Sequence, residues 1–135
     1  MKPVILILDD QTQYLRSLER ALRAGFDVRL ASSQQDAIAK LTGDVELVLT
    51  DIRLDETSDD DRQGLEFIRF ARSRHPQLPI VAMSALDVGE VEAAALAAGA
   101  NRFLRKPIVV SQLKSHIHEM TKLSLDKNRT AKSRL

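Results

Sequence analysis

Side chains that can do chemistry stand at the ends of four short runs of residues, three of which are mainly apolar. They are Asp9 and Asp10 after residues 4–8, Asp51 after 45–50, Ser84 after 80–83, and Lys106 after 102–105. If these runs are neighbouring parallel strands, their ends converge on the rim where open α/β sheets bind ligands. Three close carboxylates repel one another and invite a divalent cation. The added lysine and serine predict that the partner of the cation is an anion, most simply a phosphoryl group.

Asp51 is the candidate nucleophile of this rim. It ends the apolar run Val45–Thr50, which would hold its carboxylate in place to attack phosphorus and form an aspartyl phosphate. The alternative is an ordinary aspartate that ends a strand and stabilises the following turn.

Asp9 and Asp10 are candidate ligands of magnesium, which prefers one or two carboxylates together with waters and phosphate oxygens. Asp10 and Asp51 could bind the ion directly, with Asp9 holding a coordinated water. The alternative is that the pair caps the following helix, although one cap does not need two acids.

Lys106 and Ser84 are the expected anion ligands. Lys106 would pair with Asp51 at rest and with phosphoryl oxygens afterwards, and the Lys106–Pro107 bond can be cis. The Ser84 hydroxyl would donate to a phosphoryl oxygen. A solvated lysine and an ordinary serine after a strand are the alternatives.

The elements that must position these residues alternate along the chain. Apolar runs predict strands near 4–8, 27–31, 45–50, 79–83 and 101–104, of which 27–31 is interrupted by Asp27 and Arg29. Helical periodicity predicts helices at 11–24, 33–41, 64–74, 87–98 and 109–123, the fourth capped by Asp87. The fold class is therefore α/β, with one doubly wound, five-stranded parallel sheet between two helical layers.

Composition excludes several other classes of protein. The 135 residues fit one domain, and 44% of them are hydrophobic. The net charge is +1, of which residues 126–135 contribute +3 (four basic, one acidic), so the body carries −2 (16 basic, 18 acidic). We therefore expect no nucleic-acid binding. No cysteine is available for disulfides, and no apolar run is long enough to span a membrane.

With these residues in this order, the chain resembles the CheY-like receiver domain of two-component response regulators. The matching residues are Asp9-Asp10, Asp51, Ser84-Ala85 and 103–107, with support from 64–66, 78–80 and 98–100. The resemblance covers about residues 3–123 and implies strand order 2-1-3-4-5. We predict a receiver domain over 1–124 and a basic polar tail or linker stub over 125–135.

The resemblance implies a cytoplasmic signalling module rather than a metabolic enzyme. Asp51 would take a phosphoryl group from the phosphohistidine of a histidine kinase or phosphotransfer protein. Asp9, Asp10, Asp51 and the backbone carbonyl of Arg53 would hold Mg²⁺, while Ser84 and Lys106 would bind the phosphoryl group. Phe103 would turn inward as Ser84 moves. The surface of 87–98, 101–104 and 109–123 would then signal to an output domain or a second receiver.

Two departures and two alternative functions remain open. The loop 55–63 is acidic and roughly five residues longer than is usual in the family. It is either a solvated insertion or a segment that tunes magnesium affinity or the choice of partner. Phe103 lacks a hydroxyl, so its inward state could be populated without phosphate. The alternatives are a degenerate receiver that only binds partners, or an Asp-nucleophile phosphatase. The latter needs an aspartate where Arg53 stands.

Overall fold

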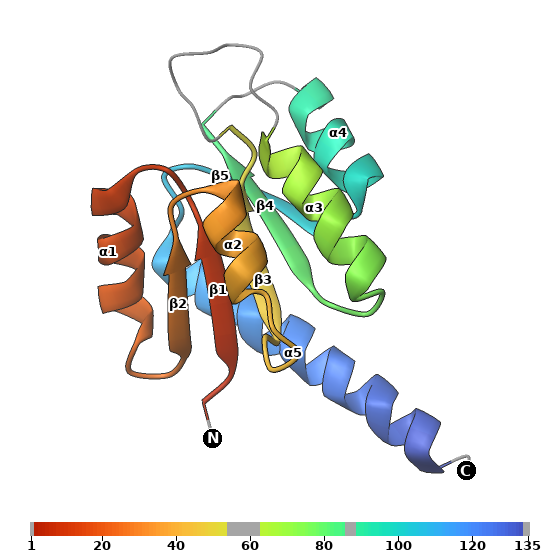
Figure 1. Ribbon diagram of the computed structural model, residues 1–135. Helices are drawn as coiled ribbons and strands as arrows, with labels where there is room; N and C mark the ends of the chain where they lie inside the picture. The colour runs from red at the N-terminus through yellow and green to blue at the C-terminus, as the bar shows by residue number, and fades with distance from the viewer. Residues whose placement is uncertain (1, 54–62, 86–88, 134–135) are drawn as a thin grey trace.

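A computed structural model describes residues 2–53, 63–85 and 89–133, with side chains described as far as Thr121. Five strands alternate with five helices along these residues (Figure 1). The strands are β1 Val4–Leu8, β2 Asp27–Ala31, β3 Leu47–Asp51, β4 Ile80–Ser84 and β5 Arg102–Arg105. The helices are α1 Thr12–Leu22, α2 Gln34–Lys40, α3 Gln63–Arg74, α4 Gly89–Ala98 and α5 Val110–Ser133.

The strands form one parallel sheet in the order β2-β1-β3-β4-β5. The fold class and the strand order are therefore as predicted. Because every strand runs the same way, the carboxyl ends of all five meet at one edge. The predicted and observed strand bounds differ by at most two residues.

Alternate residues of the strands face two separate hydrophobic cores. One core joins Leu6, Leu8, Val48, Ile80 and Ala82 to buried residues of α2, α3 and α4. The other joins Ile5, Ile7, Leu47, Leu49, Val81 and Met83 to α1 and α5. Both faces of the central strands are apolar, as expected of a parallel sheet covered on both sides. Helices therefore hold the sheet in a three-layer sandwich (Figure 1).

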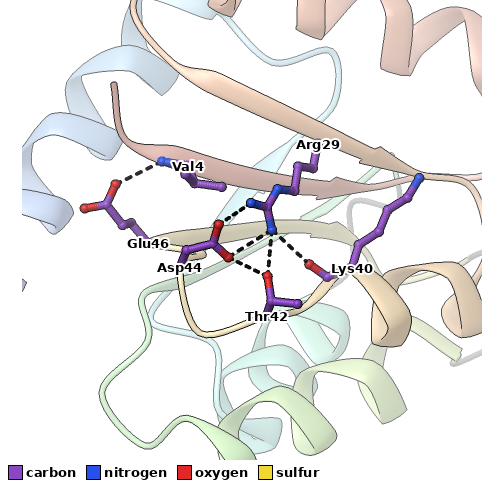
Figure 2. A network of polar contacts seen from close by, with 6 residues as sticks. All are labelled: Val4, Arg29, Lys40, Thr42, Asp44 and Glu46. Atoms are coloured by element: carbon purple, nitrogen blue, oxygen red, sulfur yellow. Dashed lines mark hydrogen bonds and ion pairs between the residues drawn. The ribbon is translucent and has the colours of Figure 1, made fainter. Parts of the chain in front are cut away.

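The edge strand β2 accommodates the charged Arg29 because this side chain reaches across to the segment before β3. Figure 2 shows its guanidinium donating to the carboxylate of Asp44, to Thr42 Oγ1 at 2.7 Å and to the carbonyl of Lys40 at 3.5 Å. Next to this network, the N–H of Val4 donates to Glu46 Oε2 at 2.9 Å. Arg29, one of the two charged residues that interrupt the run 27–31, thus fastens β2 to the α2–β3 connection.

The largest departure from prediction is the length of α5. We expected this helix to end near Leu123, but it continues to Ser133, beyond the body of the sheet (Figure 1). The prediction was wrong because we treated the loss of hydrophobic periodicity as a helix end. No glycine or proline follows Pro107 to stop the helix. The division at residue 124 between a domain and a linker remains a prediction.

Two further predictions fall outside the described residues. These are the role of the acidic loop, of which only Gln63 is described, and the capping of α4 by Asp87.

Candidate functional site

The predicted site residues come together at the carboxyl edge of the sheet. Asp51 and Ser84 are the last residues of β3 and β4, while Asp9 and Lys106 directly follow β1 and β5. Backbone hydrogen bonds extend the ladder beside them: Asp9 N–H donates to the Ala31 carbonyl at 3.1 Å, and Lys106 N–H to the Ser84 carbonyl at 2.9 Å. The backbone of Asp9 and Lys106 is therefore tied to the neighbouring strands.

Lys106 connects the acids of β1 and β3. Its Nζ lies 2.6 Å from Asp9 Oδ2 and 2.9 Å from Asp51 Oδ2. All three side chains are buried, with Asp9 fully so and Lys106 only 9% exposed. Burial lowers the pKa of the Lys106 ammonium, but the two carboxylates raise it overall. The lysine is therefore a positive charge held between Asp9 and Asp51, and the solvated-lysine alternative does not describe it.

Asp51 is a buried carboxyl whose acidity is set by opposing effects. Its pKa is raised from 3.8 to about 6, because burial and the neighbouring Asp9 raise it more than Lys106 lowers it. At neutral pH the carboxylate form still dominates, and this is the form that can act as a nucleophile. The N–H of Arg53 donates to Asp51 Oδ1 at 3.4 Å. Each carboxylate oxygen of Asp51 thus has a donor: Lys106 Nζ contacts Oδ2 and the N–H of Arg53 contacts Oδ1.

Asp9, Asp10 and Asp51 form a candidate metal centre. Each offers a carboxylate oxygen, and these atoms lie within 4.8 Å of one another. A magnesium ion with ligands at about 2.1 Å places its oxygens roughly 3 to 4 Å apart, so a small movement or one bridging water brings the set into range. Three carboxylates also outnumber the single ammonium of Lys106 among these four side chains. The donors therefore fit a hard divalent cation.

Helix capping does not account for the two adjacent acids. Residue Gln11 occupies the N-cap position of α1 and its side chain makes no capping hydrogen bond. Asp9 Oδ1 instead accepts from the N–H of Gln11 at 2.9 Å, which turns its other oxygen towards Lys106. Neither aspartate stands at the N-cap. The aspartate pair is thus placed for the rim rather than for the helix.

The remaining predicted residues have clear positions. Ser84 is 2% exposed at the end of β4. Phe103 is partly buried and packs against the core under α3 and α4. Arg53 directly follows Ile52 at the rim, and the ligand role of its carbonyl remains a prediction. The Lys106–Pro107 bond, which the sequence allowed to be cis, is cis.

Two residues near the site were not predicted from sequence. Gly64 at the start of α3 lies so close to the Asp51 carbonyl that a Cβ there would be 2.0 Å from its oxygen. Tyr14 of α1 lies with its ring 4.9 Å from Lys106 Nζ. In the sequence, Gly64 is only part of a motif and Tyr14 only a member of an apolar helix face. The spacing of residues therefore predicts neither the contact of Gly64 with Asp51 nor that of Tyr14 with Lys106.

Comparisons with known proteins agree with the fold. The family model for the response regulator receiver domain matches residues 5–118. The transcriptional regulatory protein ZraR of Salmonella typhimurium is 32% identical over 117 residues, which are 85% of this chain and 25% of ZraR. The response regulator protein PilR of Pseudomonas aeruginosa is 34% identical over 111 residues, 81% of this chain and 24% of PilR. The chain spans about a quarter of the length of these two relatives.

Solved structures lead to the same family. A CheY-like response regulator receiver domain protein from Methanospirillum hungatei superposes with a TM-score of 0.83 at 26% identity, covering 94% of this chain and 99% of that one. NtrX from Brucella abortus gives 0.85 at 26% identity, covering 99% of this chain and 29% of NtrX. None of the helices, over the part of the chain that the structure describes, is long and apolar enough to cross a membrane. The chain belongs to the response regulator receiver domain family.

Proposed function

We propose that this receiver domain takes a phosphoryl group from a phosphohistidine onto Asp51 in a magnesium-dependent reaction. One observation carries the proposal: the Lys106 ammonium contacts both Asp9 and Asp51 at an edge where three carboxylate oxygens lie within 4.8 Å. This arrangement supports the proposal, because a nucleophile, a divalent-cation site and a positive charge would then lie in one place. A turn aspartate or a solvated lysine requires none of these.

The chemistry at Asp51 is a simple displacement. One carboxylate oxygen forms a bond to phosphorus while the phosphorus–nitrogen bond of the donor breaks, and the imidazole leaves with the bonding pair and then takes a proton from solvent. Asp9, Asp10, Asp51 and the carbonyl of Arg53 would hold Mg²⁺, which neutralises charge on the phosphoryl oxygens when bound. Both partners of the transfer carry negative charge, so this neutralisation allows their approach.

Lys106 and Ser84 would hold the product. The ammonium is already 2.9 Å from the acceptor carboxylate, so a short movement brings it to a phosphoryl oxygen. The Ser84 hydroxyl would donate to another. Since the Ser84 carbonyl accepts from the N–H of Lys106, a movement of one residue acts on the other through the backbone.

The surface of α4, β5 and α5 would transmit the phosphorylated state. Among described residues, Leu96 of α4 and Val109 just before α5 are the exposed large hydrophobic side chains, at 44% and 54% exposure. Phe103, the proposed switch residue, is on the strand between these helices. Relatives such as ZraR are longer transcriptional regulators, so an output domain or a second receiver is the partner that we propose for this surface.

Intact mass after incubation with acetyl phosphate tests the reaction without needing the kinase. We expect a gain of one phosphoryl group that requires Mg²⁺ and is absent in Asp51→Asn. Asp44→Asn, which removes an exposed aspartate far from the rim, is the matched control and should gain the group normally. No gain in the wild-type protein with Mg²⁺ would favour a degenerate receiver that acts only by binding partners.

A further inference from the structure

Tyr14 contacts both sides of the proline that follows Lys106. Its ring centroid is 4.9 Å from Lys106 Nζ, and its hydroxyl oxygen accepts from the N–H of Ile108 at 3.2 Å. Pro107 has no N–H, so Ile108 provides the first backbone donor after the lysine. One side chain of α1 therefore touches the ammonium and anchors the loop that carries it.

The ring completes the surroundings of a flexible side chain. The Lys106 ammonium has Asp51 on one side, Asp9 on another and the face of Tyr14 on a third. A lysine side chain has four rotatable bonds, and ordering it costs conformational entropy. An aromatic face attracts a cation while leaving its hydrogen-bond donors available for oxygens. Tyr14 can thus restrain the lysine without competing with a phosphoryl group for its hydrogen bonds.

Packing and charge state both suit the Tyr14 side chain to a constant contact with Lys106. Its side chain is partly buried against the core under α1 and α5. Burial raises the pKa of its phenol, so the ring remains neutral and does not form an ion pair with the lysine. The contact is then an attraction between a cation and a neutral ring, which is retained when the hydroxyl is removed.

We propose that Tyr14 is a positioning residue that holds the Lys106 ammonium in place for phosphoryl capture. The ring restrains the ammonium, and the hydroxyl anchors the backbone just beyond Pro107. The proposal rests on the proposed function for its consequence, but the contact itself exists in the unphosphorylated protein. The two halves of the side chain can be separated, because Tyr14→Phe retains the ring and Tyr14→Leu removes it.

The contact can be tested by NMR without any phosphorylation. Protons above an aromatic face resonate upfield, so we expect the Lys106 Cε protons to be shifted upfield in the wild-type protein and in Tyr14→Phe. The shift should disappear in Tyr14→Leu. A Lys106 signal at the ordinary lysine position in the folded wild-type protein would overturn the proposal, whatever the outcome of phosphorylation.

The consequence is tested by the rate of phosphorylation with acetyl phosphate and Mg²⁺. We expect the Tyr14→Leu variant to be phosphorylated roughly fivefold more slowly at saturating phosphodonor. This is the size of effect that corresponds to a single cation–π contact at the protein surface. Tyr14→Phe should restore most of the wild-type rate, with matched melting temperatures confirming that both variants fold. An unchanged rate in Tyr14→Leu, or an equal loss in Tyr14→Phe, would overturn the role of the ring. If the wild-type protein itself is not phosphorylated, the proposed function fails while the NMR result still decides the contact.

Discussion

Each residue of the rim acquires its properties from neighbours that are distant in sequence. Asp51 is a buried acid whose pKa rises to about 6 through burial, against the opposing effect of Lys106. Lys106 remains charged while buried because Asp9 and Asp51 surround its ammonium. None of these residues could perform its proposed task alone, since a buried charge without partners is strongly destabilising.

Gly64 has a steric role that a substitution can test. A Cβ at this position would lie 2.0 Å from the Asp51 carbonyl oxygen and 2.5 Å from Ile52 Cα. We expect Gly64→Ala to lower the free energy of unfolding by about 1–3 kcal/mol, as overpacking does, and to displace the end of β3. Urea unfolding measures the loss.

Gly43→Ala provides the control for that substitution. Gly43 also lies outside the sheet, but no atom stands within 4 Å of a Cβ built there. Its unfolding midpoint should match the wild type or rise slightly because alanine reduces the entropy of the unfolded chain. Equal midpoints for the two variants would show that an alanine at position 64 can be accommodated and that the close approach is not a constraint.

At the scale of elements, two arginines join segments that the sheet alone leaves separate. Arg29 fastens the edge strand β2 to the α2–β3 connection, as Figure 2 shows. Arg72 on α3 donates to the carbonyl of Gly99 from Nε at 3.1 Å and from Nη2 at 2.9 Å, and to Asn101 Oδ1 at 2.8 Å. These networks lie away from the rim, so we assign them to stability.

The Arg29–Asp44 pair should make stability depend on pH. Its hydrogen bond from Arg29 lowers the pKa of Asp44 from 3.8 to about 2. Because folding lowers this pKa, the contribution of the pair is fully present above the ordinary value and is lost as the pH falls towards about 2. We expect Asp44→Asn to be slightly less stable than the wild type at neutral pH. In acid denaturation, the difference should shrink below pH 3.8. A difference that is constant across this range would contradict the assignment.

Arg72 should not tolerate replacement by lysine. Its planar guanidinium serves Gly99, Asn101 and the carbonyls of His75 and Pro76 at once, which one ammonium cannot do. We expect Arg72→Lys to cost about 1.5–3 kcal/mol of unfolding free energy, the range for hydrogen bonds to a charged group. Arg74→Lys on the same helix is the control, because Arg74 contacts only the ring of Phe70 in the described contacts. Equal losses from both variants would contradict the special role of Arg72.

At the scale of the whole molecule, the fold could be predicted further than the contacts within it. Runs of mainly apolar residues predicted all five strands, although charged residues interrupt the run of β2, and parallel strands gather their ends at one edge. The rim therefore followed from the strand assignments. The contact between Tyr14 and Lys106 could not be predicted, because it depends on how α1 packs beside the β5–α5 loop. The end of α5 was missed because we used hydrophobic periodicity as the criterion, and an α-helix does not require it.

Magnesium should stabilise the whole domain if the acids hold it. A ligand that binds only the folded state adds about 2.7 kcal/mol when its concentration is 100 times its Kd. We expect the melting temperature to rise with MgCl₂ and not with NaCl of equal ionic strength, with the effect strongly reduced in Asp10→Asn. Asp44→Asn should retain the effect, and its disappearance there or its persistence in Asp10→Asn would contradict the proposed metal site.

If Asp51 carries the phosphoryl group, chemical reduction of the phosphorylated protein should mark this residue alone. Borohydride reduces an aspartyl phosphate to homoserine and leaves free carboxylates unchanged. After treatment with acetyl phosphate and Mg²⁺ followed by borohydride, peptide mass spectrometry should find homoserine at position 51. Homoserine at the position of another aspartate, or a phosphorylated protein that yields no homoserine, would contradict the assignment of Asp51 as the phosphorylated residue.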